Sequence, residues 1–95
     1  MDKSLFRTND YCLFTFGSTS HALKAEAHLK RIGANFITIP TLREISASCG
    51  LSIKMYCDNR EAYYCSIKEN NILVDGVYHV TKRGNKLELQ KIEGK

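Results

Sequence analysis

Short apolar runs, separated by polar turns, divide the chain into predicted strands. The runs are rich in aromatic and β-branched residues and are bounded by glycine, proline or polar residues, as strands are. They cover residues 11–16, 36–39, 51–56 and 74–80. The turn at residues 83–86 is followed by a further alternating stretch, which predicts a short added strand over residues 87–92.

Two segments between these runs have the features of helices. An apolar stripe at spacings of three and four follows the hydroxyls of residues 18–20 and ends before Gly33, which predicts a helix to about Ile32. Asp58 and Glu61 have the spacing of a capping box and predict a second helix over about residues 59–70. The stripe of the first helix consists of Ala22, Ala25, Leu29 and Ile32.

The predicted order of elements is β-α-β-β-α-β, which is typical of a ferredoxin-like α+β sandwich with both helices on one face. The first and third strands would be central in its sheet. We expect a polar, loosely held arm over residues 1–10, one domain over residues 11–80, and a C-terminal tail over residues 81–95. The tail and the added strand would form a hairpin extension.

Composition and charge restrict the function classes. The chain has 95 residues, of which 43% are hydrophobic and 25% charged, as in an ordinary globular domain. The net charge of +4 is spread along the chain, and the third predicted strand lacks the glycine- and aromatic-rich run of RNA-recognition domains, so we expect no nucleic-acid partner. No signal peptide and no apolar run of about 20 residues is evident, so we expect a cytoplasmic protein with no membrane partner.

Cys49 is the most informative residue for chemistry. It lies where a hydroxyl-rich loop, residues 40–50, meets the third predicted strand, and Gly50 beside it allows another group to approach the backbone. This placement is typical of a displayed thiol, although an inert cysteine tucked under the loop fits the same pattern. Cys12 has the pattern of a core residue, and Cys57 and Cys65 have no evident role. No pair has CxxC spacing, so we expect no metal site and no cofactor.

The predicted topology brings this loop to the sheet edge where the first helix begins. A helix N-terminus carries partial positive charge, so it would lower the pKa of the Cys49 thiol. Arg43 would add a full positive charge, and His21 would act as a proton partner. The anion cradle at this edge would consist of Gly17, Ser18, Thr19 and Ser20. Residues Ser46, Ser48 and Gly50 would support the loop.

A second interpretation makes the protein a dimeric binding module for a small anion, with Cys49 structural. The hydroxyls of residues 18–20 cap the helix in either interpretation, and anion binding would be an additional role. The helix-free face of the predicted sheet is unusually apolar for a wetted surface, which favours pairing with a second copy of the chain. The residues expected on this face are Tyr11, Leu13, Phe36 and Tyr56.

Three segments, residues 11–26, 40–51 and 75–78, resemble a family of small bacterial domains described as putative selenium/sulfur carrier protein-like. The resemblance implies that Cys49 is the motif cysteine and that residues 18–21, Arg43 and Glu44 belong to the motif surface. It also implies a link to sulfur or selenium metabolism, with a donor protein and an acceptor enzyme as partners. The protein would then be a carrier and not a turnover enzyme. Leu42 and Ala47 depart from the family pattern, which has proline and serine there.

Overall fold

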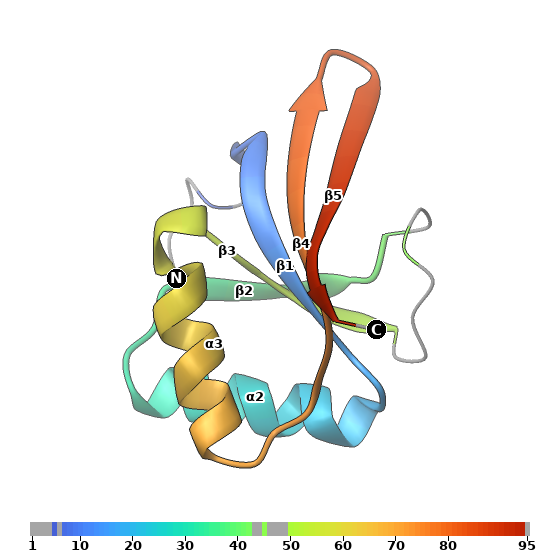
Figure 1. The fold of residues 1–95 in the computed structure, drawn as a ribbon. Helices are drawn as coiled ribbons and strands as arrows, with labels where there is room; N and C mark the ends of the chain where they lie inside the picture. Colours follow the sequence, from blue (N-terminus) through green and yellow to red (C-terminus); the bar gives the residue numbers. More distant parts are fainter. Residues whose placement is uncertain (1–4, 6, 43–44, 46–49, 95) are drawn as a thin grey trace.

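The chain folds into a five-stranded antiparallel sheet with two helices, and the predicted α+β class is confirmed (Figure 1). The computed structural model describes residues 5, 7–42, 45 and 50–94. The elements are, in chain order, β1 (Asp10–Phe16), α2 (Thr19–Arg31), β2 (Phe36–Pro40), β3 (Leu51–Met55), the 3₁₀ turn η1 (Cys57–Asn59), α3 (Arg60–Glu69), β4 (Val74–Arg83) and β5 (Lys86–Gly94).

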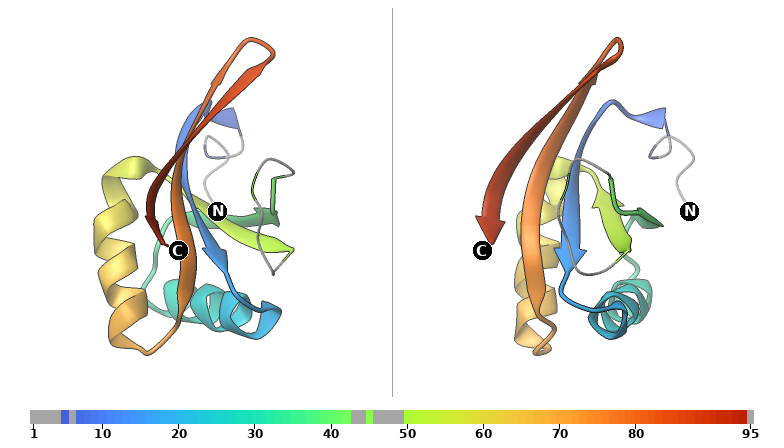
Figure 2. Two further views of the ribbon diagram at one scale, coloured as in Figure 1. Left: turned by 45° about the vertical axis from the view of Figure 1, so that its right-hand side comes forward. Right: turned by 90° about the vertical axis from the view of Figure 1, so that its right-hand side faces the viewer.

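The strands lie in the order β2-β3-β1-β4-β5, and each neighbouring pair is antiparallel. β1 is therefore the middle strand. Its Cys12 lies between Met55 of β3 and His79 of β4. β5 is longer than the predicted added strand over residues 87–92. With β4 it forms a hairpin that extends past the start of β1, away from α2 (Figure 1 and Figure 2).

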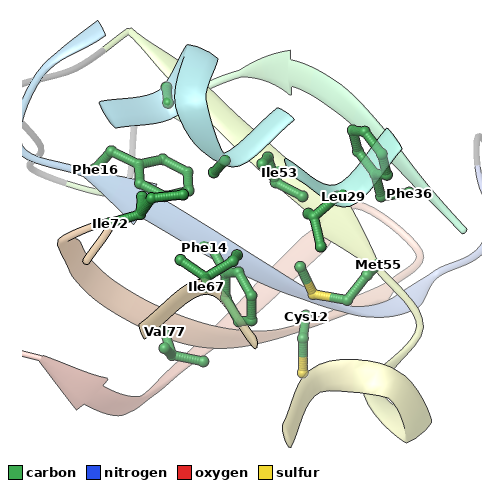
Figure 3. Close-up of a cluster of buried hydrophobic side chains, with 12 residues drawn as sticks. Cys12, Phe14, Phe16, Leu29, Phe36, Ile53, Met55, Ile67, Ile72 and Val77 are labelled. Atoms are coloured by element: carbon green, nitrogen blue, oxygen red, sulfur yellow. The ribbon is translucent and has the colours of Figure 1, made fainter. Parts of the chain in front are cut away.

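The main core lies between the sheet and the two helices. Alternate residues of β1 enter it, because successive side chains of a strand point to opposite faces. Cys12, Phe14 and Phe16 are fully buried there. Leu29 of α2 and Ile67 of α3 pack into the same cluster (Figure 3), so both helices cover one face of the sheet.

A smaller apolar cluster lies on the opposite face. It contains Tyr11 and Leu13 of β1, Val80 of β4, and Ile45 from the connection between β2 and β3. These residues are already buried within one chain, Leu13 at 0% and Tyr11 at 7% exposure. The apolar surface from which we predicted a dimer is thus largely covered, and the dimer itself stays a prediction.

The predicted position of Phe36 on this helix-free face is wrong. Phe36 pairs with Met55, which pairs with Cys12, and all three belong to the core on the helix side. Tyr56 lies just beyond the end of β3 and is partly buried.

The helix boundaries show which local signals held. Ser18 is the N-cap of α2, and Gly33 follows the helix with a φ of 73°, as predicted. The capping box expected at Asp58 does not form. The 3₁₀ turn η1 occupies that segment, and Asn59 precedes α3 without a side-chain cap hydrogen bond.

Part of the N-terminal arm is held against the domain. Leu5 is fully buried, and the carbonyl oxygen of Asn9 accepts a hydrogen bond from the N–H of Lys82 at 2.7 Å. The expectation of a loose arm therefore does not fit these two residues. Within the described part of the chain, neither helix has the length and apolar character that crossing a bilayer requires.

Candidate functional site

The two ends of the loop at residues 40–50 are joined by hydrogen bonds. The N–H of Thr41 donates to the carbonyl oxygen of Gly50 at 2.9 Å, and the hydroxyls of Thr41 and Ser52 lie 2.8 Å apart. Between these ends the structure describes Leu42 and Ile45. Four of the predicted site residues, Arg43, Ser46, Ser48 and Cys49, lie outside the described residues, as does Glu44.

The strand register places the base of this loop in the sheet. Thr15 pairs with Ser52, and Pro40 pairs with Leu51. The start of β3 therefore lies beside the end of β1, which leads directly into α2. Gly50, the neighbour of Cys49 in sequence, belongs to the sheet end at which α2 begins.

The first turn of α2 is capped by Ser18. Its side-chain oxygen accepts a hydrogen bond from the N–H of His21 at 3.3 Å. Gly17, Thr19 and Ser20 are exposed, and the first turn contains no acidic residue. Since the helix dipole gives this end partial positive charge, the turn has the electrostatic character that suits an anion.

The His21 ring has a described partner away from the loop. Its Nδ1 accepts a hydrogen bond from the N–H of Leu73, in the connection between α3 and β4, at 3.4 Å. That contact orients the imidazole toward the connection. A role for His21 as the proton partner of Cys49 stays a prediction.

A cavity of about 390 Å³ lies beside the start of α2. Gly17, Lys68 and Leu73 are among the residues that line it. Lys68 also lies over the ring of Tyr64, with 5.2 Å between its Nζ and the ring centroid. Asp75 lines the same cavity, so a lysine and a carboxylate both lie near the exposed Gly17.

Part of the loop packs on the face of the sheet opposite α2. Ile45 is only 6% exposed, and its N–H donates to the carbonyl oxygen of Leu42 at 3.0 Å. It belongs to the cluster with Tyr11 and Leu13. The loop thus joins the sheet end to the helix-free face.

Lys54 is a charge that the sequence analysis missed. Its Nζ lies 4.1 Å from the ring centroid of Tyr11, on the face that Ile45 covers, and the residue is 6% exposed. Burial lowers the pKa of Lys54 from its usual value of 10.5. A lysine between two apolar residues of a strand is normally expected on the solvent-exposed face of the sheet, so the alternation did not indicate that Lys54 is buried.

The remaining cysteines differ in environment. Cys12 is a core residue, as predicted, and its Sγ lies 2.6 Å from the Sγ of Cys57. Burial, and then the Cys57 contact, raise the pKa of the Cys12 thiol to about 12, and burial also raises the pKa of Cys57. Among the described cysteines, Cys65 is the exposed one, on α3. Because 45 positions separate Cys12 from Cys57, no local pattern in the sequence indicated their contact.

These features define a small α+β domain in which a cysteine-bearing loop begins and ends at one end of the sheet. A family model described as "Putative Se/S carrier protein-like" matches residues 11–79, and the chain belongs to this family. The match runs from β1 into β4 and includes Cys49. Comparison with curated proteins and with solved structures gives no match.

Proposed function

We propose that the protein is a carrier that accepts a sulfur or selenium atom on Cys49 and passes it on. Membership of the family, over a stretch that includes Cys49, is the observation that carries this proposal. The protein would act in the cytoplasm between a donor protein and an acceptor enzyme. It would not turn over a substrate of its own.

The transfer requires no external oxidant. The Cys49 thiolate attacks the terminal sulfur of a donor persulfide, R–S–SH, and the bond between the two donor sulfurs breaks. The donor leaves as its thiolate, R–S⁻, and Cys49 becomes a persulfide. A thiolate of the acceptor then attacks the outer sulfur and releases Cys49. A donor that carries selenium in the terminal position would react in the same way and form a selenosulfide.

Two groups around the loop support a thiolate at Cys49. The start of α2 belongs to the sheet end of Gly50. Arg43 is the second, by its position in the loop. Positive charge lowers the pKa of a thiol and so increases the population of its nucleophilic form.

We also assign β1 to β4, with the two helices, to the ferredoxin-like class. The order β4-β1-β3-β2 within the sheet and the placement of both helices against one face support this assignment. The hairpin of β4 and β5 would then be an addition to that unit.

A second candidate is a dimeric module that binds a small anion. The absence of acidic residues from the first turn of α2 favours it. Lys68 lines the cavity next to this turn, together with Asp75. In that case the anion would bind the N–H groups and hydroxyls of residues 17–20, and Cys49 would have a structural role.

Persulfide loading distinguishes the two candidates. The reduced protein is incubated with a cysteine desulfurase and cysteine, and the mass of each cysteine-containing peptide is measured. We expect one added sulfur on Cys49, no loading there in Cys49→Ser, and loading as in the parent protein for the control Cys65→Ser. The double variant Thr19→Ala, Ser20→Ala should lose sulfate or phosphate binding and load more slowly. If Cys49→Ser takes up as much sulfur as the parent protein, the carrier proposal is wrong.

A further inference from the structure

Three side chains with metal-binding atoms meet at the end of the sheet where β1 begins, and a second thiol contacts one of them. One ligand atom each of Asp10, Cys57 and His79 lie within 4.8 Å of one another. The Sγ of Cys12 lies 2.6 Å from that of Cys57. These residues come from three separate segments of the chain, around residues 10–12, 57 and 79, so their meeting depends on the fold.

The strand register explains this meeting. Cys12 pairs with His79 across β1 and β4, and Asp10, two residues earlier in β1, shares their face of the sheet. Met55 pairs with Cys12 on the other side, and Cys57 follows Met55 by two residues, at the start of η1. Figure 3 shows the Cys12 sulfur directed toward the short helical segment after β3. The four side chains are therefore held by hydrogen-bonded backbone.

We propose that Asp10, Cys57 and His79 bind a zinc ion, with Cys12 as the fourth ligand. Thiolate, imidazole and carboxylate are the ligands that zinc takes in proteins, and four of them complete a tetrahedral site. The site lies at the opposite end of β1 from the Cys49 loop, so this proposal does not depend on the carrier function.

The Asp10–His79 contact has the form of a preassembled ligand pair. The His79 Nε2 lies 2.5 Å from the Asp10 Oδ1, and both side chains are partly exposed, at 36% and 67%. A zinc ion can therefore reach them from solvent and replace the proton between them.

The thiols and a neighbouring arginine complete the charge balance. Two thiolates and one carboxylate carry three negative charges, of which zinc offsets two. The Arg60 guanidinium lies close enough to lower the pKa of both thiols, although burial outweighs it. Arg60 can thus offset the remaining charge of the ligand set, while Asp58 near Cys57 adds one negative charge outside it. Binding releases the thiol protons to solvent. Two sulfurs on one zinc ion lie roughly 3.8 Å apart, so the thiols separate by about 1 Å on binding.

A disulfide between Cys12 and Cys57 is the competing explanation of their contact. It would need an oxidant to accept two electrons while two protons leave. It also gives no role to Asp10 and His79, whose ligand atoms lie within 4.8 Å of the Cys57 sulfur. Zinc uses all four side chains and needs no oxidant.

Metal titration of the reduced full chain tests the proposal. After removal of metal with a chelator, Zn²⁺ is added against a competing indicator dye, and Co²⁺ is added to a second sample. We expect one metal ion per chain, and a tetrahedral Co²⁺ spectrum with thiolate-to-metal charge transfer. Cys57→Ser and His79→Gln should each weaken zinc binding at least tenfold, which is the lower end of what a lost partner of a metal ligand costs.

The controls separate this site from the rest of the chain. Cys65→Ser and Cys49→Ser should bind zinc as the parent protein does, and circular dichroism should show His79→Gln folded, because the side chain is partly exposed. Absence of zinc binding by the reduced parent protein would overturn the proposal. Zinc affinities of Cys57→Ser and His79→Gln equal to that of the parent protein would also overturn it. Loss of binding in Cys49→Ser would also overturn it. If the reduced chain binds no metal and air oxidation links Cys12 to Cys57, the pair is a redox pair and the zinc proposal fails.

Discussion

The backbone N–H of Thr41 donates a hydrogen bond to the carbonyl oxygen of Gly50, with 2.9 Å between nitrogen and oxygen. Pro40 and Leu51 pair in the sheet immediately beyond this bond. The segment that carries Cys49 therefore leaves and rejoins the sheet at one point. Because this closure belongs to the backbone, substitution of side chains within the loop should leave the sheet intact.

Ile45→Ala tests whether the loop is anchored to the helix-free face. Ile45 is buried with Tyr11 and Leu13, so removing its larger side chain should lower the free energy of unfolding by about 2 kcal/mol or more. Urea denaturation measures the change. Leu23→Ala is the matched control, because Leu23 is 51% exposed, and it should change stability by no more than about 0.5 kcal/mol. Equal effects of the two substitutions would contradict the anchoring of the loop.

Cys49 should be the first cysteine alkylated at neutral pH. Burial raises the pKa values of Cys12 and Cys57, which keeps both protonated, and Cys65 is the exposed comparison. Brief treatment of the native, metal-free protein with iodoacetamide, followed by peptide mapping, gives the order of modification. Modification of Cys65 or Cys57 well ahead of Cys49 would exclude an activated, displayed thiol.

Ser18→Ala should destabilise α2 and with it the domain. Its side-chain oxygen accepts the hydrogen bond from the His21 N–H, and the loss of an N-cap residue costs about 1 kcal/mol. Ser20 lies in the same turn but is not the N-cap residue, so Ser20→Ala should change the stability of the domain less. Thermal denaturation of the two variants beside the parent protein provides the comparison, and the reverse order of stability would show that Ser18 does not act as the cap.

Lys54→Met should change the pH dependence of stability. Burial lowers the folded-state pKa of Lys54 below 10.5, so at pH values between that pKa and 10.5 the unfolded chain binds more protons here than the folded chain. The stability of the parent protein relative to Lys54→Met should therefore rise with pH across this window. Urea denaturation from about pH 7 to 10.5 measures the difference. The control, Lys24→Met, removes an exposed lysine from α2. If the stability of the parent protein relative to Lys54→Met stays constant or falls as the pH rises, the burial of a charged Lys54 is contradicted.

The local signals in the sequence predicted the elements well. Strand ends coincide with Gly17 and Pro40, and α2 begins after the serine and ends before the glycine that marked its limits. These features depend on φ angles, hydroxyl caps and alternation, all of which act between residues close in sequence. They were therefore available without knowledge of the fold.

Features that depend on register were not predictable in the same way. Alternation shows that Phe36 and Thr38 share a face, but only the pairing of Phe36 with Met55 shows which face that is. The meeting of Cys12 with Cys57 and His79 depends on two such pairings at once. The burial of Lys54 depends on a ring, Tyr11, supplied by a different strand. The central residue of the site, Cys49, remains a prediction from sequence and family.

β5 also changes the outer border of the sheet. Without it, β4 would present its row of N–H and C=O groups to any extended chain that approached. β5 pairs with β4 along its length and places exposed charged residues, among them Lys86, Glu88 and Lys91, on the new border. Charged side chains on a border strand hinder the addition of foreign strands. The hairpin therefore makes the sheet less prone to aggregate from this side, so a chain shortened after Arg83 should lose solubility before it loses its helices.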